Sequence, residues 1–264
     1  MMNWSFKILP TELLENYVSA FDQSIKVDYA NLHDSELSIE TFSFYSSVSA
    51  VFSSKIEGEQ IELDSFIKHK RFGIEYLPDY TRKIDDLYEA YLFAQNNTLS
   101  SIALAQAHKL TTKHILNPAQ QGKTSVNNMF VITKDGKIEY VAAIPEKVPA
   151  EMDKFYRDLN DLLTANLSFE ETFFFAALLH LVFIKIHPFD DGNGRTARLL
   201  EKWFLAQKLG ANAWFVQSER NYYEHHQKYY NNIRLLGIDY ETLNYKEAMP
   251  FLLMLQNSVK QDAQ

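Results

Sequence analysis

The chain has 264 residues, of which 46% are hydrophobic, and a formal net charge of −8. Its length and apolar share predict one large domain, or one domain with a modest extension, around a sizeable core. The negative charge without a Lys/Arg cluster argues against nucleic acid as a partner, and the absence of cysteine excludes disulfides, thiolate metal sites and cysteine nucleophiles.

The N-terminal sequence MMNWSFKILPTELLENY lacks the basic and the long apolar segments of a secretory signal peptide. The most apolar run, residues 173–186, is too short to span a bilayer and contains His180 and Lys185. We therefore expect a cytoplasmic protein without a membrane partner, in which this run is a buried helix.

Helical periodicity dominates the chain, because Pro and Gly are sparse and apolar residues recur at helical spacing. Thr11 is the predicted N-cap of a first helix and Gly58 the predicted stop of a longer one. The predicted helices cover residues 12–21, 35–57, 79–95, 100–116, 150–165, 169–186, 195–209, 219–236 and 240–259.

Residues 128–143 are the one clear exception, since two apolar runs flank Asp135 and Gly136, a dipeptide that suits a tight hairpin turn. No other strand is predicted, so this hairpin has no sheet to join. Its open edges are expected to be covered, to aggregate or to accept an extended peptide. The fold class that follows is all-α with a single β-hairpin.

The segment HPFDDGNGRTAR, residues 187–198, follows the apolar helix. Pro188 disfavours the α conformation at His187, so the helix should end just before this histidine. Gly192 and Gly194 flank Asn193, which predicts positive-φ turns whose N–H groups form an anion-binding nest. Phe189, within the same segment, is expected to insert into the core and fix the loop.

Charged residues of the same segment suit phosphate chemistry. A new helix is expected to begin near Arg195, adding its N-terminus to the anion site, and Arg198 lies on the same face three residues later. Asp191 is placed to hold Mg²⁺, with Asp190 as the alternative ligand. His187 could take a proton from an attacking hydroxyl. The spacing of a Walker A loop is absent.

HPFDDGNGRTAR resembles the signature of the Fic family, His-Pro-Phe-x-Asp/Glu-Gly-Asn-Gly-Arg-x-x-Arg, with every fixed position filled. The resemblance covers roughly residues 35–240 and implies a Fic-type helical bundle with the hairpin as a flap. It also implies transfer of AMP from ATP to a hydroxyl of a protein side chain, with release of pyrophosphate. By this resemblance the general base is His187, the magnesium ligand Asp191, the anion hole Gly192, Asn193 and Gly194, and the phosphate clamps Arg195 and Arg198.

A second motif, SSKIEG, places Ser53 four residues before Glu57, with Gly58 next. It resembles the inhibitory helix of the Fic family. The resemblance implies that Glu57 pairs with Arg198 in place of the γ-phosphate and forces ATP into an unproductive pose, so that Glu57→Gly would derepress transfer. The same short pattern is also typical of an ordinary helix end.

The resemblance divides the chain into three parts. Residues 1–34 are expected to form a helical extension, residues 35–240 the catalytic domain with an inhibitory helix near 36–57, and residues 241–264 a C-terminal helix packed on it. Where the family often has an arginine-bearing segment before the flap and prolines after it, this chain has GKTS and AAIP. Target docking is therefore less well supported than catalysis.

Other aromatic and histidine residues have structural as well as functional interpretations. Tyr222 and Tyr223 are candidates to stack on a purine, although an aromatic-rich helix is more often core. His180 is expected to be a hydrogen-bonded core residue. Residues 225–226 and 33–34, which contain His-His and His-Asp, are expected on solvated surfaces.

The predicted function is an autoinhibited protein adenylyltransferase that uses ATP and Mg²⁺ and binds a target protein at residues 128–143. Three alternatives remain: removal of AMP with Glu57 positioning a water, transfer of phosphate or another nucleotide, and an ATP sensor without chemistry. Retention of both His187 and Asp191 argues against the sensor. Self-modification and homodimerisation stay open.

Overall fold

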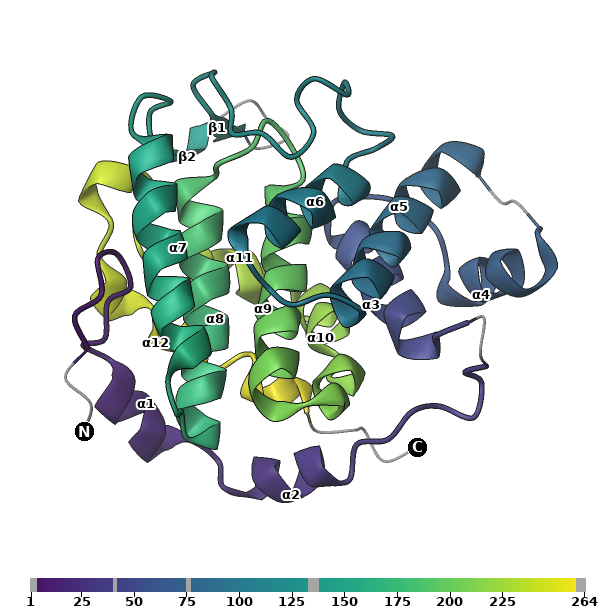
Figure 1. Ribbon diagram of the computed structural model, residues 1–264, viewed down its shortest axis with the longest axis horizontal. Coiled ribbons are helices and arrows are strands. Elements are labelled where there is room, and N and C mark those ends of the chain that lie inside the picture. The colour runs from purple at the N-terminus through teal and green to yellow at the C-terminus, as the bar shows by residue number, and fades with distance from the viewer. Residues whose placement is uncertain (1–3, 40–41, 75–76, 133–137, 260–264) are drawn as a thin grey trace.

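A computed structural model describes residues 4–39, 42–74, 77–132 and 138–259. Within these residues the chain is helical apart from one short hairpin, which confirms the predicted fold class (Figure 1). The α-helices and strands are α1 Leu14–Ala20, α2 Ser24–Ala30, α3 Phe44–Ile56, α4 Leu63–Phe72, α5 Pro78–Gln95, α6 Ser101–Thr111, β1 Phe130–Ile132, β2 Ile138–Val141, α7 Val148–Thr164, α8 Phe169–Ile186, α9 Asn193–Leu209, α10 Ser218–Glu224, α11 His226–Arg234 and α12 Met249–Leu252. Short 3₁₀ turns occupy Ala211–Phe215, Tyr240–Thr242, Tyr245–Glu247 and Gln256–Ser258.

Helix α8 forms the centre of the bundle. It begins at a capping box between Ser168 and Glu171 and runs to Ile186, as predicted. Its residues are apolar on all sides, and a helix of that kind is stable only when other elements surround it. Helices α7 and α9 lie beside it, and α3, α5 and α6 lie beyond α9 (Figure 1). No helix in the described part of the chain is long and apolar enough to cross a bilayer.

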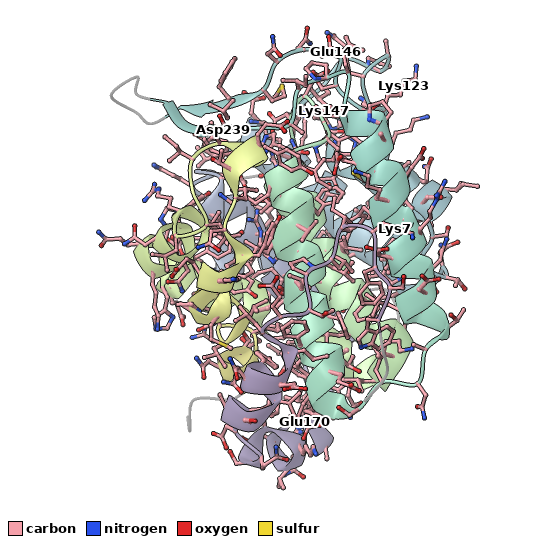
Figure 2. All side chains as sticks on the ribbon, turned by 90° about the vertical axis from the view of Figure 1, so that its left-hand side faces the viewer. Lys7, Lys123, Glu146, Lys147, Glu170 and Asp239 are labelled. Carbon is pink, nitrogen blue, oxygen red and sulfur yellow. The ribbon has the colours of Figure 1, made fainter. Side chains whose placement is uncertain are left out.

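The N-terminal segment shares the core of the bundle. The carboxylate of Asp158, on α7, accepts hydrogen bonds from the backbone N–H groups of Lys7, Ile8 and Leu9 at 2.7 to 3.0 Å. Lys7 lies against the middle of α7 in Figure 2. The hydrophobic core continues across residue 34. The domain boundary predicted there stays a prediction.

The predicted helix over residues 35–57 is wrong at its start, since α3 begins nine residues later, at Phe44. Ser43 caps it by accepting a hydrogen bond from the N–H of Ser46 at 3.3 Å. Upstream, Asp34 accepts from Ser35 N–H and Ser38 Oγ, both at 2.8 Å. Short polar side chains of this kind compete with helical hydrogen bonds, so the chain stays irregular there. The short helices α2 and α4 were not predicted.

The C-terminal quarter is more broken than predicted. The helix over residues 219–236 is divided at His225 into α10 and α11, and residues 240–259 form short turns and the four-residue α12 instead of one helix. Pro250 lies near the start of α12, where its ring and missing N–H prevent a helix from continuing through it. His225 and His226 are exposed as expected, and so are His33 and Asp34.

The hairpin pairs Phe130 with Val141 and Val131 with Tyr140, in antiparallel register. Its second strand is partly covered, because the N–H of Val141 donates to the carbonyl of Ile238 at 2.8 Å. Asp239, next in sequence, lies at the base of the hairpin (Figure 2). Of the three outcomes expected for a strand edge, coverage therefore applies to this part of β2. The predicted turn at residues 135–136 lies outside the described residues.

Candidate active site

The loop after α8 has the backbone that its sequence predicts. His187 caps the helix in the left-handed conformation, with φ 55° and ψ 58°. Phe189 is buried as expected, and Asn193 braces it by accepting from the Phe189 N–H at 2.9 Å and donating to the Phe189 carbonyl at 2.8 Å. The side chain of Asn193 is thus used within the loop, and only its backbone N–H is left to contribute to an anion hole.

A larger side chain is excluded at Gly192 and at Gly194 for different structural reasons. Gly192 has φ 79°, and a Cβ there would lie 2.6 Å from Cγ2 of Thr112. Gly194 is helical, because α9 begins at Asn193 and not at Arg195, so the predicted positive φ at Gly194 is wrong. A Cβ at Gly194 would instead lie 2.5 Å from Oε1 of Glu57. The N–H groups of the first turn of α9 lack acceptors within the helix, so they remain available to an anion.

His108 holds the same loop from behind, a role that was not predicted. The N–H of Gly122 donates to its Nδ1 at 2.9 Å, so its Nε2 carries the hydrogen and donates to the Asp191 carbonyl, also at 2.9 Å. Its ring stacks on Phe189 with centroids 3.6 Å apart. Burial lowers the pKa of His108 to about 4, which keeps the ring neutral and this hydrogen-bond pattern fixed.

The two adjacent aspartates differ in availability. Asp190 accepts hydrogen bonds from Ser125, Gln120 and Asn127 at 2.5, 2.8 and 3.2 Å. Burial would raise the pKa of Asp190, but these donors hold it below its usual value. The side chain of Asp191 is 51% exposed. Asp191 is therefore the better candidate ligand of the pair.

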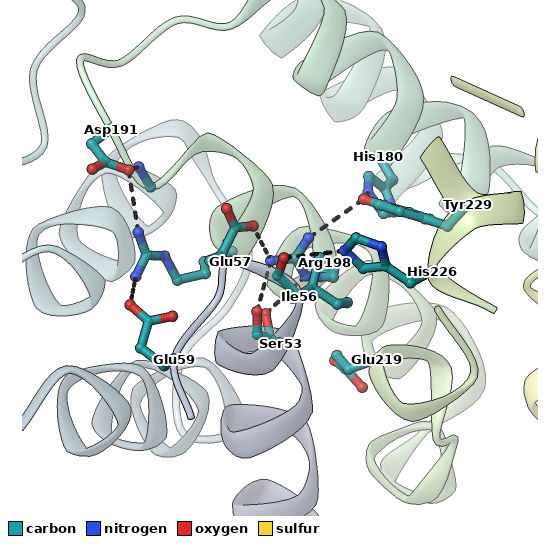
Figure 3. A network of polar contacts seen from close by, with 12 residues as sticks. Ser53, Ile56, Glu57, Glu59, His180, Asp191, Arg198, Glu219, His226 and Tyr229 are labelled. Atoms are coloured by element: carbon teal, nitrogen blue, oxygen red, sulfur yellow. Dashed lines mark hydrogen bonds and ion pairs between the residues drawn. The ribbon is translucent and has the colours of Figure 1, made fainter. Parts of the chain in front are cut away.

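Arg198, on α9, is fully buried and contacts the end of α3 (Figure 3). Its Nε donates to Ser53 Oγ at 2.8 Å and its Nη2 to the Ser53 carbonyl at 3.0 Å. The same Nη2 forms an ion pair with Glu57 Oε1 at 2.5 Å. The structure thus brings together the catalytic loop and the SSKIEG motif, which are separated by more than a hundred residues.

Arg195, the other arginine of the motif, lies between two carboxylates. Its Nη2 is 3.2 Å from Asp191 Oδ1 and its Nη1 is 3.5 Å from Glu59 Oε1. Arg195 and Glu59 are 5% and 7% exposed, so solvent weakens this pair little. Glu59 was not predicted, although an acid two residues after Glu57 is visible in the sequence.

One turn delivers both glutamates. Gly58 has φ 101°, its N–H donates to the Lys55 carbonyl at 3.1 Å, and the N–H of Glu59 donates to the Ser54 carbonyl at 3.2 Å. These two bonds define a Schellman motif, which requires a left-handed residue and favours glycine. The turn fixes Glu57 and Glu59 on the two arginines together.

The sequence profile of the Fic/DOC family matches residues 98–205, which include the loop and both arginines. The chain contains a Fic/DOC family domain. It is 30% identical over 137 residues to the protein adenylyltransferase Fic of Nematostella vectensis, which covers 51% of this chain and 29% of that protein. It is also 30% identical over 128 residues to the protein adenylyltransferase Fic of Drosophila yakuba. That match covers 48% of this chain and 24% of the Drosophila protein. The chain thus spans less than a third of the length of these relatives.

A Fic family protein from Desulfovibrio desulfuricans G20 has the same fold, with a TM-score of 0.75 at 18% identity over 97% of this chain and 74% of that one. The shared fold extends well beyond residues 98–205. The N-terminal and C-terminal helices described above therefore lie within the region of structural likeness.

Electrostatics of the Fic motif oppose protonation of both Glu57 and His187. Burial would raise the pKa of Glu57, but Arg198 and Arg195 hold it below its usual value of 4.5. Burial lowers the pKa of His187 below 6.5, against the opposing effects of the Ile184 carbonyl, Glu57 and Asp191. At neutral pH the glutamate is thus a full negative charge and the histidine a neutral base.

A pocket beside the motif encloses about 640 Å³ of empty space, including its open mouth. Its lining comes from the turn, the hairpin, the end of α8, the start of α9 and α11: Glu57, Val131, Tyr140, Ile184, Lys185, His187, Gly194, Tyr230, Ile233 and Arg234.

The predicted purine-stacking residues are not in this lining. Tyr222 is fully buried and donates to Glu201 at 2.8 Å, so it has no face to offer a base. Tyr223 packs against Phe52 and Lys55 on the other side of the turn. Tyr230, seven residues further along, lines the pocket instead. A break between α10 and α11 separates these tyrosines, and the sequence pattern did not reveal it.

The motif fits a magnesium ion brought by a polyphosphate better than a resident metal. Among the described residues, no group of three or more His, Asp or Glu side chains converges on one point. Asp191 offers one exposed carboxylate, and Mg²⁺ is commonly held by one or two carboxylates together with substrate phosphates. The donor set is therefore suitable for Mg²⁺ only in the presence of a nucleotide.

Proposed function

We propose that this chain is a protein adenylyltransferase that transfers AMP from ATP to a hydroxyl of a target protein and is inhibited by its own α3 end. The observation that carries the proposal is that His187, Gly194 and Glu57 line one pocket, and that Glu57 forms an ion pair with the buried Arg198 behind it. The names of the relatives support adenylyl transfer.

The reaction would use the chain's residues as follows. His187 Nε2 accepts the proton of the target hydroxyl as its oxygen attacks the α-phosphorus. The bond from the α-phosphorus to the bridging β-oxygen breaks, and pyrophosphate leaves with the electron pair. The N–H groups at the start of α9, including those of Gly194 and Arg195, stabilise the negative charge on the transferring phosphate. Asp191 would hold the Mg²⁺ that neutralises charge on the phosphates.

Autoinhibition would act through charge and space. Glu57 is ionised at neutral pH and occupies Nη2 of Arg198, so a terminal phosphate cannot reach that donor while the pair persists. Glu59 holds Arg195 in the same turn. Nucleotide entering the pocket would therefore adopt a pose in which the α-phosphorus is not in line with the attacking hydroxyl.

The target would dock along the hairpin. The outer side of β2 is partly covered by residues 238–239, whereas Val131 of β1 lines the pocket beside His187. An extended segment pairing with β1 would bring a hydroxyl side chain to the catalytic histidine. Residues 35–240 would form the catalytic domain, and self-modification and homodimerisation are part of the same proposal.

The test is the position of the label. Wild type, Glu57→Gly and Glu57→Gly/His187→Ala are incubated in Mg²⁺ with ATP labelled at the α-phosphate or at the γ-phosphate, alone and with a cell lysate. We expect protein labelling from the α position only, strong in Glu57→Gly and absent in the double variant. Label from the γ position would indicate a kinase, and retained nucleotide binding without label would indicate a sensor or removal of AMP.

A further inference from the structure

Arg198 has one partner that does not belong to the inhibitory α3 end. Its Nη1 lies 3.4 Å from the hydroxyl of Tyr229, on α11, whereas its other hydrogen bonds go to Ser53 and Glu57 (Figure 3). Withdrawal of the turn would remove the Glu57 contact and loosen those of Ser53. Tyr229 would then be the contact that keeps the guanidinium in place.

A buried hydrogen-bonded chain stands behind this hydroxyl. Nε2 of His180, on α8, lies 3.0 Å from the Tyr229 hydroxyl, and Nδ1 lies 2.8 Å from Glu201 Oε2, on α9. Tyr222, on α10, donates to the same carboxylate oxygen at 2.8 Å. All four side chains are completely buried, so four helices fix the position of the Tyr229 hydroxyl.

The direction of each hydrogen bond follows from the groups involved. A carboxylate only accepts, so Nδ1 of His180 carries a hydrogen, and with His180 as the neutral imidazole its Nε2 presents a lone pair. The Tyr229 hydroxyl therefore donates to His180, and its own lone pairs face Arg198. Since a guanidinium only donates, the relay from Glu201 orients Tyr229 as an acceptor for Arg198 Nη1.

A neutral acceptor suits an arginine that must bind phosphate. A carboxylate at this position would compete with the phosphate for the charge of Arg198, as Glu57 does, whereas a phenolic oxygen restrains the guanidinium and leaves its charge available. The relay also leaves Oε1 of Glu201 buried, with no hydrogen-bond partner among the described residues. Buried unsatisfied oxygens are costly, and packing alone gives no reason to keep one.

We propose that Tyr229, oriented by His180 and Glu201, is the positioning residue that holds Arg198 for the nucleotide phosphates once Glu57 has withdrawn. This inference rests on the proposed function. Tyr229 acts through Arg198 and does not touch the reacting atoms. Its effect is therefore expected in the derepressed protein and not in the inhibited one.

The experiment compares Tyr229→Phe with Tyr222→Phe, both made in the Glu57→Gly protein. The control removes an equally buried hydroxyl from the same Glu201 carboxylate but leaves the Arg198 contact intact. Mg²⁺-ATP affinity is measured by calorimetry, and kcat and KM by transfer of the α-label. We expect Tyr229→Phe to weaken ATP binding and kcat/KM about tenfold, as for loss of a hydrogen bond to a charged group, and Tyr222→Phe to change either by less than about twofold.

Equal effects of the two substitutions would overturn the inference, since they would mean that Tyr229 acts only by stabilising the core. Melting temperatures are measured for both, and all assays are run below the lower transition so that unfolding does not contribute. If Glu57→Gly transfers no label, the proposed function fails, and the calorimetric comparison alone decides the role of Tyr229. A fall in ATP affinity confined to Tyr229→Phe would support it, and equal affinities would exclude it.

Discussion

Replacing Glu57 by Gln should lower the stability of the fold and increase the stabilisation that ATP binding provides. The described residues offer Arg198 no other ion pair, so Gln leaves a fully buried guanidinium without a counter-charge. Breaking a buried pair in this way typically costs about 3–5 kcal/mol, and we reduce this to about 2–3 kcal/mol because the Glu57 side chain is 27% exposed. With roughly 2–4 °C per kcal/mol for a domain of this size, the melting temperature should fall by about 5–10 °C.

The assay is thermal unfolding with and without saturating Mg²⁺-ATP. A nucleotide at one hundred times its Kd stabilises by about 2.7 kcal/mol, and wild type should gain less because its terminal phosphate cannot contact Arg198 while Glu57 is paired with it. Because the pKa of Glu57 is lowered, the pair's contribution is complete above pH 4.5 and is lost only as the pH falls through that lowered pKa, so the difference should be constant across neutral pH.

Glu62→Gln is the matched control for this charge change. Glu62 is 78% exposed and pairs with Lys55 at 3.0 Å, so its loss should cost less than about 1 kcal/mol. Equal melting temperatures of Glu57→Gln and Glu62→Gln would refute this prediction. So would an ATP stabilisation of Glu57→Gln that is no larger than that of wild type.

Further predictions concern the turn, the metal ligand and the base. In Gly58→Ala the new Cβ meets no neighbouring atom, but a residue at φ 101° is strained, so the substitution should destabilise the fold by about 1–2 kcal/mol. It should also raise basal transfer. Thermal melting and α-label incorporation measure these two effects, and no change in either would contradict the role of the turn. Glu59→Gln should tighten ATP binding in calorimetry by releasing Arg195 from one carboxylate, and weaker binding would assign Glu59 a supporting role. Asp191→Asn should raise the Mg²⁺ concentration needed for half-maximal transfer several-fold, with an unchanged Mg²⁺ dependence as the contrary result. Because burial lowers the pKa of His187 below 6.5, kcat/KM should stay constant as the pH falls to 6.5 and decline only at lower pH. A loss of half of kcat/KM at pH 6.5 or above would exclude His187 as a neutral buried base.

The sequence predicted elements whose signals are local. Helix α8 has a capping box at one end and Pro188 near the other, with an apolar run between, so its bounds follow from adjacent residues. The catalytic loop is contiguous, and its histidine, aspartates and arginines therefore had to lie close together. These are the parts of the fold and of the candidate site that could be predicted.

Other features depend on contacts between distant segments. Ser43 is the true N-cap of α3, but several serines near it are equally suitable, and the structure selects Ser43 where its N–H meets the Tyr88 hydroxyl at 3.0 Å. His108 reaches the loop across 83 residues and Tyr229 reaches Arg198 across 31. No periodicity records such pairings, because they are decided by how helices pack and not by their own sequences.

The measurement that tests the account most directly is the single-turnover rate of α-phosphoryl transfer in wild type and in Glu57→Gly, with ATP affinity determined for both. Glu57→Gly/His187→Ala serves as the control for chemistry. The account predicts that all three proteins bind ATP and that only Glu57→Gly transfers AMP rapidly. Equal transfer rates in wild type and Glu57→Gly would contradict the proposal that the ion pair with Arg198 restrains the enzyme.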